Sequence, residues 1–188
     1  MPGDAEATKR RLLAAGAREF AEYGIAGARV DRIAEQARSN KAQIYHYFGS
    51  KDALVDAVFR ELVANTVRDV PIDATDLPGY AARLFDGYCD HPEIPRIAAW
   101  YRLERAGTRS PLQVIVASNQ HKVAAIEAAQ RAGTLPARWD AAELLALVLT
   151  VAGMWSGMTP EFTTLFAGHD RARRRAVIVA AVTALLAP

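Results

Sequence analysis

A short polar stretch in the first third of the chain carries the chemical groups that proteins use to bind nucleic acids. Lys41 and Lys51 offer ammonium groups to phosphates. Gln43 offers an amide that can form two hydrogen bonds with the edge of an adenine base. Tyr45 and His46 add polar tips and flat aromatic faces. Together these residue types predict a surface that contacts both the backbone and the bases of a nucleic acid.

Two short helices are needed to hold these side chains in place. The spacing of apolar residues predicts one helix over 30–37 and a second over 41–48, joined by three or four residues. Ala34 is small where the helices must approach each other, and Ile44, ten residues later, points back at that contact. This is the geometry of a helix-turn-helix, whose second helix enters the major groove of DNA.

The same stretch resembles the TetR family of bacterial transcriptional regulators. The residues that match the family's signature are Phe20, Gly24, Ile33-Ala34-Glu35-Gln36-Ala37, Lys41 and Ile44-Tyr45-His46-Tyr47-Phe48-Gly49-Ser50-Lys51-Asp52-Ala53-Leu54. The match extends over 8–59, roughly a third of the chain. The resemblance implies an all-α homodimer with two N-terminal DNA-binding heads on a palindromic double-stranded operator. It also implies a small-molecule pocket and a dimer interface in each C-terminal domain.

The expected DNA contacts follow from the exposed positions of this motif and from the resemblance. They are Arg29, Arg38, Asn40, Lys41, Ala42, Gln43, Tyr45, His46, Tyr47 and Lys51.

Three positions depart from the family's pattern. Arg38 and Ser39 stand where the family usually has a glycine and an apolar residue, and Ala28 with Arg29 replaces the usual Thr or Ser before the first short helix. A left-handed residue other than glycine costs about 1 kcal/mol, and so does a lost helix cap, ~1 kcal/mol. Gly27 is the candidate replacement cap.

The rest of the chain is predicted to be helical as well, so the expected fold class is all-α with about nine helices. A first helix over 5–23 ends at Gly24, and Ser50 is the expected N-cap of a long helix. After a linker over 70–79, apolar spacing predicts helices at 80–89, 92–106, 111–132, 140–158 and 170–187. The expected domains are a three-helix helix-turn-helix domain at 1–50, a connecting helix at 51–70, and a helical ligand-binding and dimerisation domain at 71–188.

Composition favours a folded protein of the cytoplasm, and the family resemblance implies that the protein is not an enzyme. Apolar residues make up 51% of the 188 residues and charged residues 23%, which is typical of a globular chain. The net charge is only +2, and residues 24–48 alone carry a surplus of two positive charges. Cys89 is the only cysteine, so no internal disulfide can form, and no secretory signal precedes the first helix. The longest uncharged run, 144–160, is shorter than the ~20 residues of a membrane span, so no membrane partner is expected.

No catalytic or metal site is expected. The four histidines lack the spacing of metal ligands, and no nucleophile elbow, phosphate loop or zinc-protease motif occurs. The expected ligands are DNA and a small-molecule effector of unknown structure, which the resemblance implies. The arginine cluster at 171–175 is predicted to be the solvated start of the last helix.

The last two helices are predicted to form a dimer interface. The final helix carries no charge from Ala176 onwards, and a helix that is apolar all round must be buried on most faces. Two such helices from each of two chains would form a four-helix bundle about a two-fold axis. The expected interface residues are Leu144, Val148, Val151, Val177, Val182 and Leu185. The alternative is an ordinary buried hairpin within a monomer.

Aromatic and methionine side chains in the second half provide a candidate ligand pocket. The expected lining residues are Trp100, Tyr101, Met154, Trp155, Met158 and Phe162. Such side chains suit a medium-sized apolar ligand, although the same spacing also occurs in plain core packing.

The function that these features favour is a sequence-specific, homodimeric transcriptional regulator, a repressor that a small ligand releases from its operator. Two alternatives remain open at this stage. One is a constitutive dimeric DNA-binding protein without a ligand. The other is a helical protein that binds small molecules and whose DNA-binding head is degenerate.

Overall fold

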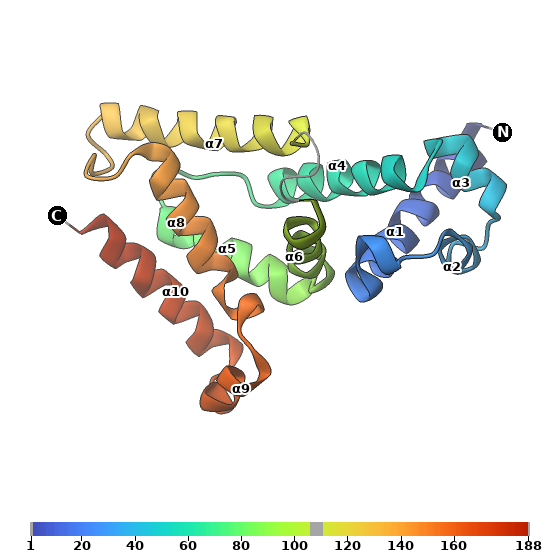
Figure 1. Ribbon diagram of the computed structural model, residues 1–188. Helices are drawn as coiled ribbons and strands as arrows, with labels where there is room; N and C mark the ends of the chain where they lie inside the picture. Colours follow the sequence, from blue (N-terminus) through green and yellow to red (C-terminus); the bar gives the residue numbers. More distant parts are fainter. Residues whose placement is uncertain (1, 106–110, 188) are drawn as a thin grey trace. The chain divides into compact units, whose positions relative to one another are not determined.

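The computed structural model describes residues 2–105 and 111–187, and their regular structure is entirely helical (Figure 1). The helices are α1 (Pro2–Gly27), α2 (Val30–Gln36), α3 (Lys41–Phe48), α4 (Lys51–Asp69), α5 (Leu77–Asp90), α6 (Glu93–Arg105), α7 (Gln113–Arg131), α8 (Ala141–Gly153), α9 (Pro160–Thr163) and α10 (Arg171–Leu186). Two short 3-10 helices, η1 (Met154–Gly157) and η2 (Thr164–Phe166), flank α9. The predicted all-α fold class is therefore confirmed.

The helices pack into two compact units, and each unit combines two separate stretches of the chain. Unit 1 comprises Met1–Asn65 and Glu93–Ile115, and unit 2 comprises Thr66–Pro92 and Val116–Pro188. The expected domain boundaries after residues 50 and 70 stay a prediction. The two packing units have different boundaries, because α6 packs against α1 and therefore belongs to the unit of the N-terminal helices.

Unit 1 is built around the apolar stripe of α1. Leu12 and Phe20 are fully buried together with Ile33 of α2 and Ile44 of α3. As predicted, Gly24 interrupts α1: its backbone has φ 74°, and helical structure resumes for only one turn, to Gly27. The predicted cap of α4 is confirmed as well, because the Ser50 hydroxyl accepts a hydrogen bond from the Ala53 N–H at 3.0 Å.

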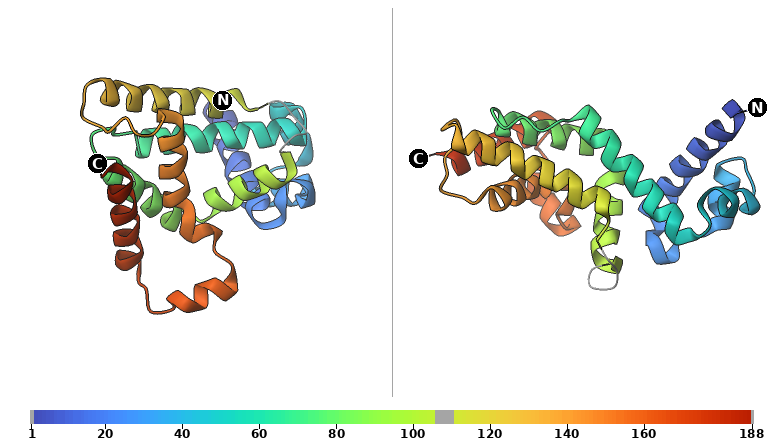
Figure 2. Two further views of the ribbon diagram at one scale, coloured as in Figure 1. Left: turned by 60° about the vertical axis from the view of Figure 1, so that its left-hand side comes forward. Right: turned by 90° about the horizontal axis from the view of Figure 1, so that it is seen from above.

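Unit 2 consists mainly of α5, α8 and α10, which lie side by side (Figures 1 and 2). Its fully buried residues include Leu77, Tyr80, Ala81, Ile126, Leu144, Val148, Ile178 and Val182. Asp140 begins α8 with a capping box that includes Glu143, and Asp170 caps α10. The small α9–η2 segment stands away from α10 in the left view of Figure 2.

Several helix ends differ from their predicted positions. The Asp76 carboxylate accepts the Gly79 N–H at 2.8 Å and caps α5, so α5 begins at Leu77 and takes up residues expected in the linker. Pro78 lies in the first turn, where proline is tolerated. The regular helix α8 ends at Gly153 rather than 158, and α9 was not predicted. The predicted end of α6 at residue 106 lies outside the described residues.

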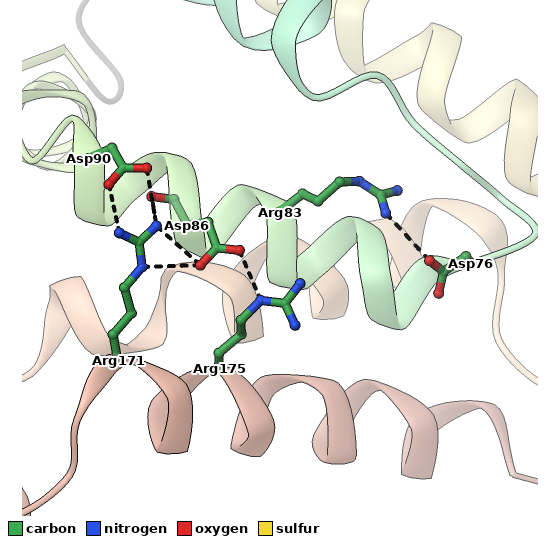
Figure 3. A network of polar contacts seen from close by, with 6 residues as sticks. All are labelled: Asp76, Arg83, Asp86, Asp90, Arg171 and Arg175. Carbon is green, nitrogen blue, oxygen red and sulfur yellow. Dashed lines mark hydrogen bonds and ion pairs between the residues drawn. The ribbon is translucent and has the colours of Figure 1, made fainter.

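Two arginines of the cluster at the start of α10 are exposed, as predicted, with side chains of Arg171 and Arg175 47% and 43% accessible, and they also form ion pairs (Figure 3). Arg171 forms ion pairs with Asp90 at 2.7 Å and with Asp86 at 3.2 Å, and Arg175 pairs with Asp86 at 2.9 Å. The hydrogen bonds from Arg171 lower the pKa of the Asp90 carboxyl below its usual value. This network ties α10 to the C-terminal half of α5. A separate pair, Asp76 with Arg83, lies nearer the start of α5.

No single helix in 2–105 or 111–187 is long and apolar enough to cross a membrane. By length and composition alone, one broken pair does pass: Ala141–Gly157 with Pro160–Phe166, bent by 87°.

Candidate nucleic-acid interface

The two helices of the predicted motif are present and pack against each other. Helices α2 and α3 are joined by residues 37–40, and Ile44 is fully buried where the two helices meet, with Ala34 5% exposed. Asn40 begins α3, because its side-chain carbonyl accepts the Gln43 N–H at 3.0 Å. Sequence reasoning assigned Asn40 to DNA contact and missed this capping role, although Asn is among the best N-cap residues.

One face of α3 is exposed and carries most of the predicted base-contacting residues. Lys41, Ala42, Tyr45 and His46 are all exposed. Their positions along the helix place them on one side of it. Tyr47 is half-buried, and its ring contacts those of His46 and Phe48 edge-on at 5.2 and 6.3 Å. The Tyr47 ring therefore contributes to the packing of the helix-turn-helix.

Gln43 is half-buried on α3, and its side-chain oxygen is buried without a hydrogen-bond partner among the described residues. A buried amide oxygen without a partner is uncommon, and an incoming donor would satisfy it. Its role in base contact stays a prediction.

The two candidate phosphate-binding lysines have partners within the chain. The Lys41 ammonium lies 3.3 Å from the Asp31 carboxylate, and both side chains are more than half exposed. The Lys51 ammonium donates to the Ala26 carbonyl at 3.0 Å. Both contacts are exposed, and an ammonium group has three donors, so each lysine can bind a phosphate while it keeps its partner within the chain.

Arg38 has a left-handed backbone at the position where the family usually has a glycine. Its φ is 51°, and it is the only non-glycine residue of positive φ in the described part of the chain. The Ser39 N–H donates to the Ala34 carbonyl at 2.9 Å and the Arg38 N–H to the Glu35 carbonyl at 3.0 Å. These two bonds form a Schellman motif that closes α2. Arg11 adds a third bond, from Nε to the Ala37 carbonyl at 3.1 Å.

Replacing Arg38 with glycine should leave the melting temperature unchanged or raise it slightly. The variant removes backbone strain of about 1 kcal/mol, while the freer unfolded chain offsets up to ~1 kcal/mol of that gain. If Arg38 also contacts a phosphate, R38G will weaken DNA binding more at low salt than at high salt. Melting curves and affinities at two salt concentrations separate the two effects. A clear fall in melting temperature would contradict the presence of strain.

A buried glutamate in α1 replaces the missing cap of α2. The cap position is Arg29, not Gly27 as expected, and its side chain forms no capping bond. Instead, Glu19 Oε1 accepts the Arg29 N–H at 2.8 Å and the Arg32 Nε–H at 2.8 Å. The Glu19 side chain is 0% exposed, and its hydrogen bond raises the pKa of Arg32. The Arg32 guanidinium also lies over the Tyr23 ring, 4.1 Å from its centre.

Glu19 was missed by sequence reasoning, although a signal exists. It is an acidic residue next to Phe20 within the apolar stripe of α1. A charge at such a position requires a partner inside the fold, because an unpaired buried carboxylate is too costly.

Two family models together match most of the chain. The model described as bacterial regulatory proteins, tetR family, matches residues 12–58, and the model described as tetracyclin repressor-like, C-terminal domain, matches residues 76–183. The chain belongs to the TetR family. The HTH-type transcriptional repressor SCO4008 of Streptomyces coelicolor is 36% identical over 168 residues, which are 88% of this chain and 86% of that protein.

Solved structures of TetR-like proteins have the same fold. The putative transcriptional regulator SCO4942 of Streptomyces coelicolor has a TM-score of 0.84 and 41% identity, over 95% of this chain and 97% of that one. AibR, in complex with isovaleryl coenzyme A and operator DNA, has a TM-score of 0.70 at 17% identity, over 93% and 97% of the two chains. This second likeness shows a shared fold.

In this TetR-family chain, the residues of the predicted ligand pocket belong to different packing units. Trp100 and Tyr101 are in unit 1, where the Tyr101 ring packs on Phe59 at 4.7 Å. Met154, Trp155, Met158 and Phe162 are in unit 2. Trp155 and Phe162 each contact Phe166, at 5.1 and 5.3 Å. The six residues remain a prediction as a set, and each group has a packing role of its own.

Three of the six predicted interface residues need correction. Leu144, Val148 and Val182 are 0% exposed within the single chain, because they fill the core between α5, α8 and α10. A residue with no accessible surface cannot contact a partner subunit. Val151, Val177 and Leu185 are only half-buried and stay predictions. Three exposed positions of α10 carry alanine, Ala176, Ala180 and Ala184, and their spacing of four residues places them on one face.

Proposed function

We propose that this chain is a homodimeric transcriptional repressor that binds operator DNA through α3 and leaves it when a small molecule binds unit 2. The observation that carries the proposal is the exposed face of α3, with Lys41, Tyr45 and His46 presented by a packed helix-turn-helix. The relatives support it, since SCO4008 is named a transcriptional repressor and AibR was solved with operator DNA. Release by a ligand requires only that DNA and ligand favour different conformations of the dimer.

Unpartnered polar groups in unit 2 support an effector site there. Tyr80 is 0% exposed, and its hydroxyl has no hydrogen-bond partner among the described residues. Burial, together with nearby Tyr88, raises the pKa of Tyr80 to about 12, so the phenol is a neutral donor at neutral pH. A buried donor of this kind needs an acceptor, which an effector with a carbonyl or carboxylate group would supply.

Helix α7 adds two polar groups on the face that leads into the same core. Ser118, Lys122 and Ile126 follow one another at intervals of four residues, and Ile126 is fully buried in the same core cluster as Tyr80. The Ser118 hydroxyl is buried without a partner in the described chain, and burial lowers the pKa of Lys122. A half-buried ammonium favours an effector that carries a negative charge. A melting curve with short-chain and long-chain carboxylic acids tests this class, and Lys122→Ala should abolish any stabilisation.

DNA binding itself is tested with the region upstream of the chain's own gene. Lys41→Ala and Lys51→Ala should weaken binding to all DNA, and each should reduce the slope of log affinity against log salt by about 0.9 per lost phosphate contact. Gln43→Ala should instead relax the preference at one base pair, at a cost of ~1–3 kcal/mol for the preferred sequence. Fluorescence anisotropy with specific and random duplexes measures both effects.

The matched control is Arg131→Ala, which removes a basic side chain from the end of α7 and should leave DNA affinity unchanged. Equal loss of specific and random binding in Gln43→Ala would contradict its role in base contact. If the unaltered protein binds neither duplex, the proposed function is wrong.

A further inference from the structure

Side chains of α2, α4 and α6 all contact one short turn of unit 1, residues 24–27, which begins at the break in α1. Glu104, near the end of α6, accepts hydrogen bonds from two successive N–H groups of this turn. Its Oε1 lies 3.1 Å from the Ile25 nitrogen, and its Oε2 lies 2.6 Å from the Ala26 nitrogen. A carboxylate that accepts two backbone N–H groups forms strong, charge-assisted bonds.

The carbonyl groups of the same turn face residues of the DNA-binding head. The Ala26 carbonyl accepts the Lys51 ammonium at 3.0 Å, and the Gly27 carbonyl accepts Arg32 Nη2 at 3.1 Å. The N–H groups of the turn are therefore held by α6, while its carbonyls orient side chains at the starts of α2 and α4. Lys51 is the residue to which we assign a phosphate contact.

The glycine at the start of the turn permits this approach of α6. At Gly24, where φ is 74°, a Cβ atom would lie 2.7 Å from Glu104 Oε1 and 3.1 Å from the Trp100 ring. A second bond, from Arg96 Nε to the Ala21 carbonyl at 2.9 Å, fixes the other end of α6 against α1. The position of α6 relative to α1 is thus determined by polar contacts at both ends.

We propose that Glu104 is a positioning residue for DNA binding, which acts through the turn at 24–27 and Lys51. Its carboxylate holds the turn in the shape in which the Ala26 carbonyl directs the Lys51 ammonium. The turn therefore links the Glu104 carboxylate to the phosphate contact that we assign to Lys51. The inference rests on the proposed DNA-binding function and adds a residue to it.

The isosteric variant Glu104→Gln gives the sharpest test. One end of a glutamine side chain is an NH₂ group, which cannot accept from a backbone N–H, so one of the two bonds is replaced by a repulsive contact. We expect at least a fivefold loss of affinity for the upstream duplex at constant salt. Hydrogen exchange, followed by NMR in the free protein, should become faster at the Ile25 and Ala26 amides. Glu61→Gln, which removes a negative charge from α4 of the same unit, is the control and should change neither quantity.

A double-mutant cycle shows whether the effect passes through Lys51. In the Lys51→Ala background, Glu104→Gln should cause no further loss of affinity, because the ammonium that the turn directs is absent. If the fold loss of DNA affinity in the double variant equals the product of the two single losses, the proposal is wrong. It is also wrong if Glu104→Gln lowers the melting temperature but leaves DNA affinity unchanged. Specific binding by the unaltered protein must be present in the same experiment. If the unaltered protein shows no specific binding, the proposed function is wrong. If it binds specifically and Glu104→Gln does not change its DNA affinity, only this inference is wrong.

Discussion

Replacing Val182 with glutamate should unfold unit 2, whereas the same change at Ala180 should leave the chain folded but monomeric. Val182 is 0% exposed in the core against α5 and α8, so a carboxylate there loses its water without gaining a partner. That cost amounts to several kcal/mol, a large part of the ~5–15 kcal/mol by which a typical domain is stable. Ala180 is exposed on α10 and lies one helical turn after Val177, which stays a predicted interface residue.

Circular dichroism and sedimentation distinguish the two outcomes. Ala180→Glu should keep its helical signal and sediment as a monomer, since a carboxylate at the predicted interface would lose its water without gaining a partner. Ala128→Glu, at an exposed position of α7, is the matched control and should remain a folded dimer. A folded, dimeric Val182→Glu variant would contradict the assignment of that residue to the core. An unperturbed dimer in Ala180→Glu would place the interface on another face.

Removing the buried carboxylate of the head should have the second large effect. Glu19→Ala leaves the Arg29 N–H without its acceptor and the partly buried Arg32 without its ion pair. We expect the free energy of unfolding to fall by about 2–4 kcal/mol, as for other buried pairs that lose one partner. Glu19→Gln should lose less, because its amide oxygen can still accept one of the two donors. Urea denaturation measures both variants.

The pairing itself can be separated from the loss of packing. Arg32→Ala and the double variant with Glu19→Ala complete a cycle, in which the double variant should lose clearly less than the two single losses added together. Glu35→Ala, at an exposed position of α2, should change the free energy of unfolding by no more than about 0.5 kcal/mol. Strict additivity would mean that the carboxylate and the guanidinium do not stabilise each other.

The features that sequence predicted well are those decided by neighbouring residues. Gly24, Ile44 and Ser50 act through a backbone angle, a helix face and a cap, each of which depends on a few residues on either side. The left-handed backbone at Arg38 was only a conditional expectation, taken from the glycine that the family usually has at this position, and the structure supplies the angle.

The features that were missed depend on contacts between distant segments. An apolar position such as Leu144 or Val182 shows that something covers it, but not whether the cover is the same chain or a second copy. The partner of Arg171 lies 85 residues away in the sequence, at Asp86, so no local pattern could reveal that the arginine is engaged. Glu104 contacts Ile25 across 79 residues, which is why the turn at 24–27 was taken only as a helix end.

The interleaving of the two units has a consequence for synthesis on the ribosome. Because unit 1 needs Glu93–Ile115, the helix-turn-helix emerges long before α6 is available to cover α1, and unit 2 waits for the C-terminal helix α10. Neither unit can fold to completion in the order in which the ribosome releases it, so the nascent chain exposes apolar surface for most of its translation. A polypeptide that ends at residue 65 would contain the helix-turn-helix but would lack α6, which packs against α1. Premature termination should therefore yield a substrate for proteases rather than an unregulated DNA-binding fragment.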